Sequence, residues 1–491
     1  MNKLFLFPLL ILLTGAVQLP GQADIYFQPI NQVQINLRGG VQVLGSITKE
    51  FPSAGFVVVH FDGECYASVG DRIVLAGTDD GDWGVDDGSI AVESSLPGFG
   101  RPFSHTRVYP VSAGTHTYSA VGENYVETDG SGRATIYGSL TVKYFPDTEL
   151  AGVEASGIVF GGDVTNSTVV AEHTIHINQP GRIIVRFDGY CNSDPGDRIV
   201  LAASNTMNWS FNDGNVSVEA VNEGDVVQNS FSHTRVYNVN APGDYTYYAI
   251  AQTYGKKAGN GMIAVYGNLL VEYYPTAAPA KVLFDGFTLP EIDLNGQSTE
   301  LTSLTLDAPA AGKVMVVLDG YLTAGDGYDI ILAASNNGEW SANDGRLDLQ
   351  ALDNDQNRYS FSHTRVYSIP AGTHTFYGVG EIMGGSGDET ADLFGALTVT
   401  YFPTGSTSTF DAKAGENTFT IYPNPSGDIV YVQLRDPDQD RQGIQILDVN
   451  GKILSTYPSA SGGTTKLELS GIPPSMYWVK VGDGLKPLLR M

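Results

Sequence analysis

Apolar and polar residues alternate along short stretches of this chain, and one such stretch occurs three times. The heptapeptide Phe-Ser-His-Thr-Arg-Val-Tyr is found at 103–109, 231–237 and 361–367. It holds β-branched and aromatic residues and no Gly or Pro, so it predicts a strand. Because side chains alternate across a strand, Phe, His, Arg and Tyr share one face, and Ser, Thr and Val share the other. Spacings of about 130 residues between the copies indicate three repeats.

The same succession of segments surrounds each copy. In the first repeat, an apolar strand that ends in an Asp-Gly turn (57–63), a second strand (73–76) and a Trp loop (83–88) precede the heptapeptide, and an alternating strand ending in Pro (137–146) follows it. No segment shows a sustained 3.6-residue apolar period. Short strands at regular spacing predict an all-β sandwich. The predicted repeats are 24–147, 148–276 and 277–404.

The identical polar residues of the heptapeptide indicate a constraint beyond filling a core, because core strands tolerate apolar exchanges. One interpretation is a satisfied polar network within each repeat, since a buried Arg must be paired. The other is a face that meets a ligand or the other repeats. We expect the Asp of the Asp-Gly turn to pair with the Arg, because a planar guanidinium suits a carboxylate. The residues are His105, Arg107, His233, Arg235, His363 and Arg365, with Asp62, Asp188 and Asp319 as salt-bridge partners.

A metal site is a further hypothesis for the three His residues. If the repeats form a trimer within one chain, with these strands at its axis, three imidazoles could converge on a metal. The alternative is a hydrogen bond within each repeat. The sequence leaves the metal content open.

The Trp loops carry a second set of candidate residues. Each has a Trp followed by Asp or Asn, Asp and Gly, which is typical of a hairpin turn but also supplies oxygen ligands of the kind that calcium prefers. The Trp either fills the core or offers an exposed flat face to a sugar ring, beside polar groups for its hydroxyls. The candidate loop residues are Trp83, Asp86, Asp87, Trp209, Asn212, Asp213, Trp340, Asn343 and Asp344.

Composition narrows the function classes. The formal net charge is −27, which argues against nucleic acid, because that ligand needs a basic surface. Cys65 and Cys191 occupy equivalent positions, and Leu322 stands there in the third repeat. This pattern favours a small apolar site, with a bridge between repeats as the alternative. No nucleophile-elbow, zinc-protease or phosphate-binding motif occurs.

Both ends of the chain carry export signals. Residues 1–23 read as a secretory signal peptide, with Lys3, an apolar run from Leu4 to Leu13 and small residues before the cleavage position. At the other end, a polar linker at 405–414 precedes a distinct segment at 415–491.

The segment at 415–491 resembles the type A C-terminal sorting domain of the type IX secretion system. The opening Tyr-Pro-Asn-Pro motif and the central Asp-Val-Asn-Gly-Lys turn carry the resemblance, while Ser475 departs from the usual Gly. The resemblance implies a small β-sandwich that is recognised by the type IX secretion machinery, and export across an outer membrane to the cell surface or the medium. The motif residues are Tyr422, Pro423, Asn424, Pro425, Asp448, Gly451 and Lys452.

The repeats themselves resemble the jelly roll of the tumour-necrosis-factor and complement-globular-head superfamily. An Ala-Gly turn into an aromatic strand (113–118) and a closing Gly-x-Leu-Thr-Val strand (138–142) carry this resemblance. It implies trimers of jelly rolls, so three tandem copies could form an intramolecular pseudo-trimer. Separate beads on a string are the alternative.

We therefore expect a secreted or cell-surface, non-enzymatic binding or adhesive protein. Three near-equal copies favour binding, because repetition turns weak contacts into avidity. The partner would be a polysaccharide or another surface ligand, and calcium is the one cofactor that the loops suggest. The alternatives are a structural surface-layer or spacer protein and an enzyme that acts on polysaccharide.

Overall fold

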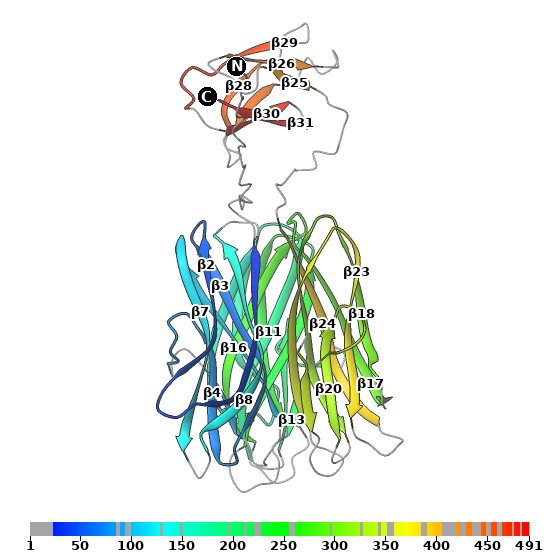
Figure 1. Cartoon of the computed structure of the whole chain (residues 1–491). Coiled ribbons are helices and arrows are strands. Elements are labelled where there is room, and N and C mark those ends of the chain that lie inside the picture. Colours follow the sequence, from blue (N-terminus) through cyan, green and yellow to red (C-terminus); the bar gives the residue numbers. More distant parts are fainter. Residues whose placement is uncertain are drawn as a thin grey trace, which may run out of the picture. The chain divides into compact units, whose positions relative to one another are not determined.

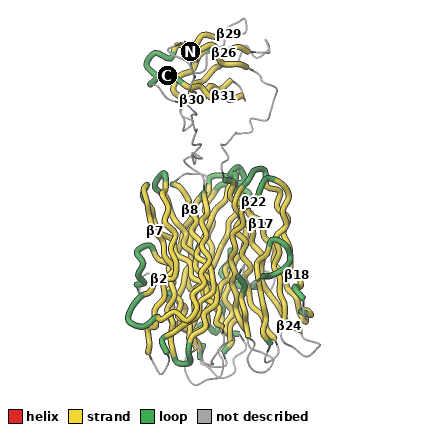
Figure 2. The backbone as a smooth tube through the Cα atoms, in the orientation of Figure 1, coloured by secondary structure: helices red, strands yellow, loops and turns green. Residues whose placement is uncertain are grey.

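The structure is a computed structural model in which every regular element is a β-strand (Figure 2). It describes residues 23–84, 89–93, 100–127, 131–147, 151–194, 197–210, 214–219, 227–254, 261–294, 297–324, 328–341, 345–350, 358–383, 390–404, 419–422, 429–434, 443–447, 453–458, 464–473, 476–481 and 484–490. Within these ranges no helix could cross a membrane. Nearly all of the predicted signal peptide and the whole linker at 405–414 lie outside them. The chain divides into two compact units, Met1–Gly405 and Ser406–Met491.

Each repeat contributes eight strands. Figure 1 labels many of them and colours them in chain order. Repeat 1 has β1 (Asp24–Asn36), β2 (Gln42–Phe51), β3 (Gly55–Ala67), β4 (Asp71–Thr78), β5 (Ile90–Glu93), β6 (Gly100–Val111), β7 (Gly114–Glu127) and β8 (Arg133–Pro146). Repeat 2 has β9 (Gly152–Asp163), β10 (Thr168–Ile177), β11 (Gly181–Ser193), β12 (Arg198–Ser204), β13 (Val216–Glu219), β14 (Val227–Val239), β15 (Gly243–Thr253) and β16 (Met262–Pro275). Repeat 3 has β17 (Lys281–Asp293), β18 (Thr299–Ala308), β19 (Gly312–Ala324), β20 (Asp329–Ser335), β21 (Leu347–Gln350), β22 (Tyr359–Ile369), β23 (Gly372–Met383) and β24 (Thr390–Pro403).

The eight strands of a repeat form two four-stranded antiparallel sheets with one topology. In repeat 1 the orders are β1-β8-β3-β6 and β2-β7-β4-β5, and the sheets of repeats 2 and 3 repeat both orders. Two facing sheets of this kind make an eight-stranded jelly roll. The predicted all-β class and the jelly-roll resemblance are therefore confirmed.

The Asp-Gly pair does not end a strand as predicted, because β3 runs through it from Gly55 to Ala67. Gly63 has φ 151° and pairs with Gly138 of β8. A Cβ at Gly63 would lie 2.1 Å from the carbonyl oxygen of Tyr137. Glycine at this position therefore lets two central strands approach closely in the middle of the sheet, and the same pairing recurs in repeats 2 and 3.

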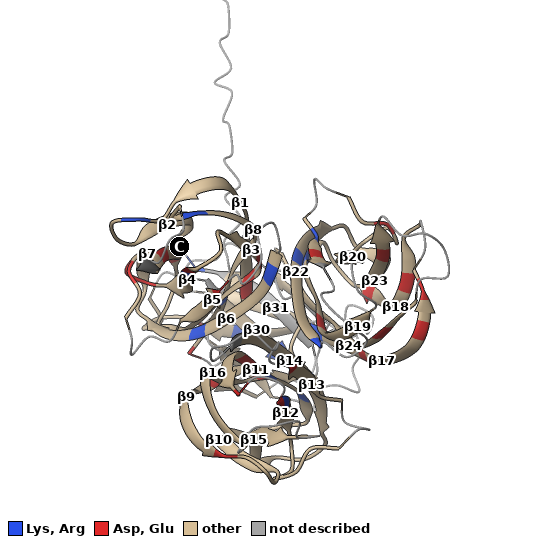
Figure 3. Cartoon of the chain, turned by 90° about the horizontal axis from the view of Figure 1, so that it is seen from below, with Lys and Arg blue, Asp and Glu red and all other residues tan. Residues whose placement is uncertain are grey.

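The three jelly rolls pack around a common axis (Figure 3). Each has its own apolar core between its two sheets. A further buried cluster contains residues of all three repeats. The equivalent residues Val58, Ile184 and Met315 belong to it. Phe145, Tyr274 and Phe402 form a second equivalent set in that cluster. Apolar burial therefore holds the repeats together as one unit.

The second unit contains a three-stranded and a four-stranded sheet around its own core. Alternating buried residues such as Val430 and Val432 explain why these segments form strands with one face inward. Its strands are β25 (Phe419–Tyr422), β26 (Ile429–Leu434), β27 (Ile444–Leu447), β28 (Ile453–Tyr457), β29 (Thr464–Glu468), β30 (Met476–Val481) and β31 (Gly484–Leu489).

Candidate functional site

The heptapeptide strand of each repeat packs against the next repeat around the axis. β6 contacts β9 and β11, β14 contacts β19 and β24, and β22 contacts β3 and β8. The third contact leads back to the first repeat, so the three junctions close a ring. The sequence motif is therefore the joint of the assembly.

The Ser and Thr hydroxyls of the motif face a carboxylate of the next repeat. Thr106 and Ser104 of repeat 1 both donate hydrogen bonds to Oδ2 of Asp188 in repeat 2. This contact explains why the Ser and the Thr are identical in all three repeats, because an Asp stands at the same position in every repeat. The counterparts are Thr234 and Ser232 to Asp319, and Ser362 to Asp62.

The Arg residues do not lie on the Asp face, contrary to the predicted salt bridges. Asp62 stands opposite Ser104 in the β3–β6 ladder, and side chains alternate across a strand, so Arg107 points to the other face. Its Nη1 donates to Asn268 Oδ1 of repeat 2 at 3.3 Å. Arg235 lies over the ring of Phe284, and Arg365 lies over that of Phe27, at 5.3 and 5.4 Å from the ring centres. All three guanidinium groups thus contact the next repeat.

The His residues lie inside their own repeats and do not converge. Nδ1 of His105 accepts the Gly77 backbone N–H at 3.0 Å, and the Tyr109 hydroxyl donates to the carbonyl oxygen of the same Gly77. Burial lowers the pKa of His233 to about 3 and that of His363 to about 4. The hypothesis of a shared His metal site is therefore wrong, and no group of three metal-ligating side chains occurs among the described residues. The counterpart bonds are Ala203 N–H to His233 and Ala334 N–H to His363.

The three Asp residues instead surround the axis in a buried charged cluster. Asp62, Asp188 and Asp319 are each at most 2% exposed. Burial raises the pKa of Asp188 to about 7 and that of Asp319 to about 6, although Arg186 opposes the shift. Arg186 is the single guanidinium of this cluster among the described residues, and its Nη1 lies 3.2 Å from Nδ1 of His60.

The residue two positions before each Asp, on the same face of the strand, differs between repeats, so a pattern of identical residues does not point to it. His60, Arg186 and Val317 occupy one equivalent position, and only repeat 2 places a permanent cation there. A second buried pair at the axis joins Lys143 of repeat 1 to Glu272 of repeat 2, where repeat 3 has Thr400. The signal that could have found these residues is a change of charge at an otherwise repeated apolar strand.

The two cysteines are free and fully buried, in the separate cores of repeats 1 and 2. This agrees with the small apolar site, and the alternative of a bridge between Cys65 and Cys191 is wrong. Burial raises the pKa of Cys191 to about 12, so its thiol is unreactive at neutral pH.

The Trp residues of the three loops are half-buried and follow β4, β12 and β20, and none of them belongs to a core cluster. The indole N–H of Trp83 donates to Glu123 at 2.8 Å. Beside it stands Tyr125, which is 59% exposed, with the ring centres 5.6 Å apart. Each Trp therefore has a fixed orientation and is only partly buried, but the guanidinium group of Arg346 lies over the ring of Trp340 at 4.5 Å. The counterparts are Trp209 with Gln252 and Tyr254, and Trp340 with Glu381 and Met383.

The acidic residues predicted beside each Trp lie outside the described residues. These are Asp86, Asp87, Asn212, Asp213, Asn343 and Asp344. The calcium hypothesis therefore stays a prediction.

Residues 420–489 match the family described as the secretion system C-terminal sorting domain. This segment is a type IX secretion sorting domain. It directs export, so the protein is secreted across the outer membrane to the cell surface or the extracellular space. Tyr422 lies in β25, and the other predicted motif residues fall outside the described ones: Pro423, Asn424, Pro425, Asp448, Gly451 and Lys452.

The remaining comparisons concern the whole chain. No curated protein matches it. The ectodomain of ANX2 from Arabidopsis thaliana is 10% identical, with 53% of this chain and 92% of that chain covered and a TM-score of 0.17. T=1 particles derived from infectious bursal virus give 8% identity, 76% and 73% coverage and a TM-score of 0.19. Similarities at these TM-scores carry no argument about function.

Proposed function

We propose that the secreted protein is a non-enzymatic binding protein that presents three related Trp surfaces to a polysaccharide. The observation that carries the proposal is the recurring Trp. Each indole is held by a hydrogen bond from its N–H to a Glu or Gln on the adjacent strand. A flat aromatic face beside polar groups is the usual chemistry of sugar recognition.

The ring arrangement supports binding through several weak sites. The three surfaces belong to one compact unit, because buried contacts join the repeats at the axis. A long polysaccharide can reach more than one surface, and each further contact is then intramolecular. Weak single sites would thus add up to useful avidity.

The proposal is tested with the three-repeat segment 24–404, which forms its own compact unit. Its binding to insoluble cellulose, chitin and xylan is measured by depletion from solution, with calcium and with a chelator. The series Trp83→Ala, Trp83→Ala with Trp209→Ala, and all three Trp→Ala should lower affinity step by step. Each lost stacking contact should cost about tenfold or less, and the triple variant should no longer bind. Trp83→Phe is the matched control, because it keeps a flat ring.

Three outcomes would contradict the proposal. A triple variant that binds as tightly as the unchanged protein would remove the Trp surfaces from the function. Absence of binding to any polysaccharide tested would favour the structural spacer. Release of reducing sugar during the assay would contradict the non-enzymatic assignment, and loss of binding in the chelator would place calcium in the site.

A further inference from the structure

One junction between repeats differs from the other two at a pair of facing residues. In repeat 2, Tyr190 stands opposite Tyr266, and the rings stack at 4.9 Å with an interplanar angle of 16°. In repeat 3, Tyr321 and Phe394 stack in the same way at 4.8 Å and 9°. In repeat 1 the residue opposite Tyr137 is Glu64. A carboxylic acid therefore replaces half of a stacked aromatic pair.

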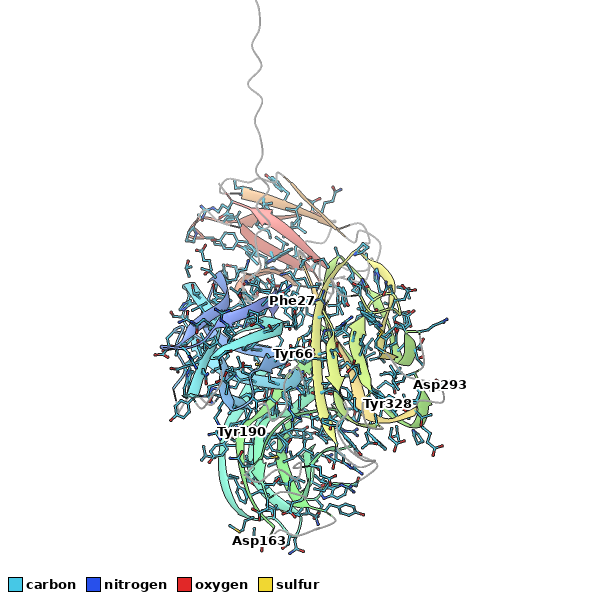
Figure 4. The ribbon with its side chains drawn as sticks, turned by 60° about the horizontal axis from the view of Figure 1, so that its bottom comes forward. Phe27, Tyr66, Asp163, Tyr190, Asp293 and Tyr328 are labelled. Carbon is cyan, nitrogen blue, oxygen red and sulfur yellow. The ribbon has the colours of Figure 1, made fainter. Side chains whose placement is uncertain are left out.

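This replacement coincides with a cavity of about 560 Å³ between repeats 3 and 1. Tyr137 turns to Tyr66 instead, and their rings meet edge to face at 6.1 Å. Tyr66 and Tyr190 mark the two junctions in Figure 4, the first between repeats 1 and 3 and the second between repeats 1 and 2. The cavity is within the usual range for small-molecule sites, about 300–1,000 Å³.

The wall contributed by repeat 3 also differs from its counterparts. Arg346 and Asp348 line the cavity, where repeat 1 has Ser89 and Ala91 in the equivalent positions. Nη2 of Arg346 lies 3.3 Å from Oδ2 of Asp348. The Asp348 backbone N–H donates to Oε2 of Glu64 at 2.6 Å, which ties the two repeats together across the cavity. Three polar replacements therefore meet at one junction.

The charges in the cavity nearly balance at neutral pH. Glu64 is 3% exposed, and burial raises its pKa to about 8 although the Asp348 N–H opposes the shift. Glu64 is thus mostly protonated at pH 7 and can donate a hydrogen bond. Arg346 and Asp348 form an ion pair. An uncharged ligand with hydroxyl groups suits this wall better than an anion or a cation.

We propose that the junction of repeats 3 and 1 binds one uncharged sugar residue. The aromatic rings of Tyr66 and Tyr137 offer apolar contact to the sugar ring. Glu64, Asp348 and Arg346 provide donors and acceptors for its hydroxyls, as in other sugar and small-molecule sites. The site occurs once per chain and is separate from the Trp83 and Trp209 surfaces. It adjoins the third surface, because the guanidinium group of Arg346 lies over the ring of Trp340 at 4.5 Å, but its cavity and polar wall are argued without the proposed function.

The test uses the secreted protein and the methyl glycosides of glucose, galactose, mannose and N-acetylglucosamine, with glucosamine as a cationic probe. Saturation-transfer NMR and calorimetry should show one site per chain for at least one neutral glycoside, with a dissociation constant of about 10 mM or tighter. The variant with both Trp83→Ala and Trp209→Ala should bind this glycoside unchanged, which separates this site from the proposed polysaccharide surfaces.

Glu64→Tyr is the decisive variant, because it restores the aromatic pair of the other junctions and removes the carboxyl group from the cavity wall. It should bind the glycoside at least tenfold more weakly while its melting temperature does not fall. Should this variant fail to fold, Arg346→Ser and Asp348→Ala together remove the polar wall and should give the same loss. Tyr190→Phe at the opposite junction is the matched control and should bind normally.

Glu64→Gln tests the protonated acid directly. It should bind within about threefold of the unchanged protein at pH 7, because an amide also donates a hydrogen bond. Above pH 8 the unchanged protein should lose affinity, and the variant should not. Failure of every neutral glycoside to bind, binding of glucosamine alone, or a folded Glu64→Tyr protein with undiminished affinity would each overturn the proposal.

Discussion

The junction between repeats 2 and 3 and the junction between repeats 3 and 1 are formed by the same kind of strand contact, but the residues next to that contact differ. Both use the heptapeptide strand, and in both a Ser hydroxyl of that strand donates to an Asp of the next repeat. Next to this joint, the first junction has stacked Tyr321 and Phe394, and the second has Glu64 and a cavity. The residues that are identical in all repeats therefore hold the repeats together, and the residues that differ give one junction a cavity that the other lacks.

The axis teaches the same lesson in terms of charge. A trimer of identical chains would place three copies of Arg186 or of Lys143 together, which like-charge repulsion disfavours. A single chain can place one cation among three carboxyls, and one Lys against one Glu. Tandem repetition thus allows a buried charge arrangement that strict three-fold symmetry does not.

The largest effect should come from removing the single guanidinium at the axis. Arg186→Ala leaves buried carboxyls without a cation, so the free energy of unfolding should fall by roughly 3–5 kcal/mol. Urea unfolding of segment 24–404 measures it. Arg72→Ala is the matched control, because its ion pair with Glu93 is partly exposed and should contribute about 1 kcal/mol or less. Equal effects of the two variants would contradict the buried cluster.

Asp188→Asn should change how stability depends on pH. The pKa of Asp188 is about 7 in the folded protein and about 4 when unfolded. The folded state therefore holds the extra proton, so this group's contribution to stability is present at low pH and is lost as the pH rises towards 7. The variant should gain roughly 2–3 kcal/mol relative to the unchanged protein between pH 5 and pH 8. Melting curves of both proteins at pH 5 and pH 8 measure this difference. A variant that is stabilised more at pH 5 than at pH 8, relative to the unchanged protein, would contradict the raised pKa of Asp188.

The Thr hydroxyls of the joint should make similar contributions at two junctions, although Thr234 also accepts a hydrogen bond from Arg186 Nε at 3.2 Å and Thr106 is bonded to His60 Nδ1 at 2.8 Å. Thr106→Val and Thr234→Val each remove the donor to a buried carboxyl and should each cost about 1–3 kcal/mol. The exposed Thr48, which pairs with Thr117 on the outer sheet, provides the control Thr48→Val, with little expected change. Chemical denaturation compares the three variants. Widely different costs for Thr106 and Thr234 would show that the two joints are not equivalent.

The smallest effect should come from the motif arginines. Arg235→Ala removes a cation–π contact with Phe284, so the loss of stability should be about 0.5–1 kcal/mol. Arg235→Lys, measured in parallel by thermal melting, should recover part of this loss. A cost as large as that of Arg186→Ala would restore the view that the Arg is a buried salt-bridge partner.

Much of the fold could be predicted from the sequence. The heptapeptide spacing gave three repeats, and the alternation of residues gave strands, because both are local patterns. The Asp-Gly pair misled the prediction because the same dipeptide marks a turn or, as at Gly63, a close approach of two central strands. Only the partner strand decides between these structures.

The candidate site was less accessible to sequence reasoning. The motif was expected to be a polar network or a contact face, and it contains both: His105 bonds within its repeat, and Thr106 bonds to the next. Arg186 and Glu64 stand at positions that differ between the repeats, and their roles depend on how the repeats face one another, so the repeated motif did not indicate them. The sequence left the pseudo-trimer and the string of beads open, because contacts between repeats leave no local pattern.

Small-angle X-ray scattering of segment 24–404 tests the ring most directly. Three jelly rolls around one axis predict a radius of gyration of about 21 Å, the value for a compact chain of this length. Arg186→Ala, measured in the same way, should expand or dissociate the ring if the buried cluster holds it. A value of roughly 30 Å or more for the unchanged segment, as expected for three beads in a row, would contradict the joint, the axial cluster and the junction pocket together.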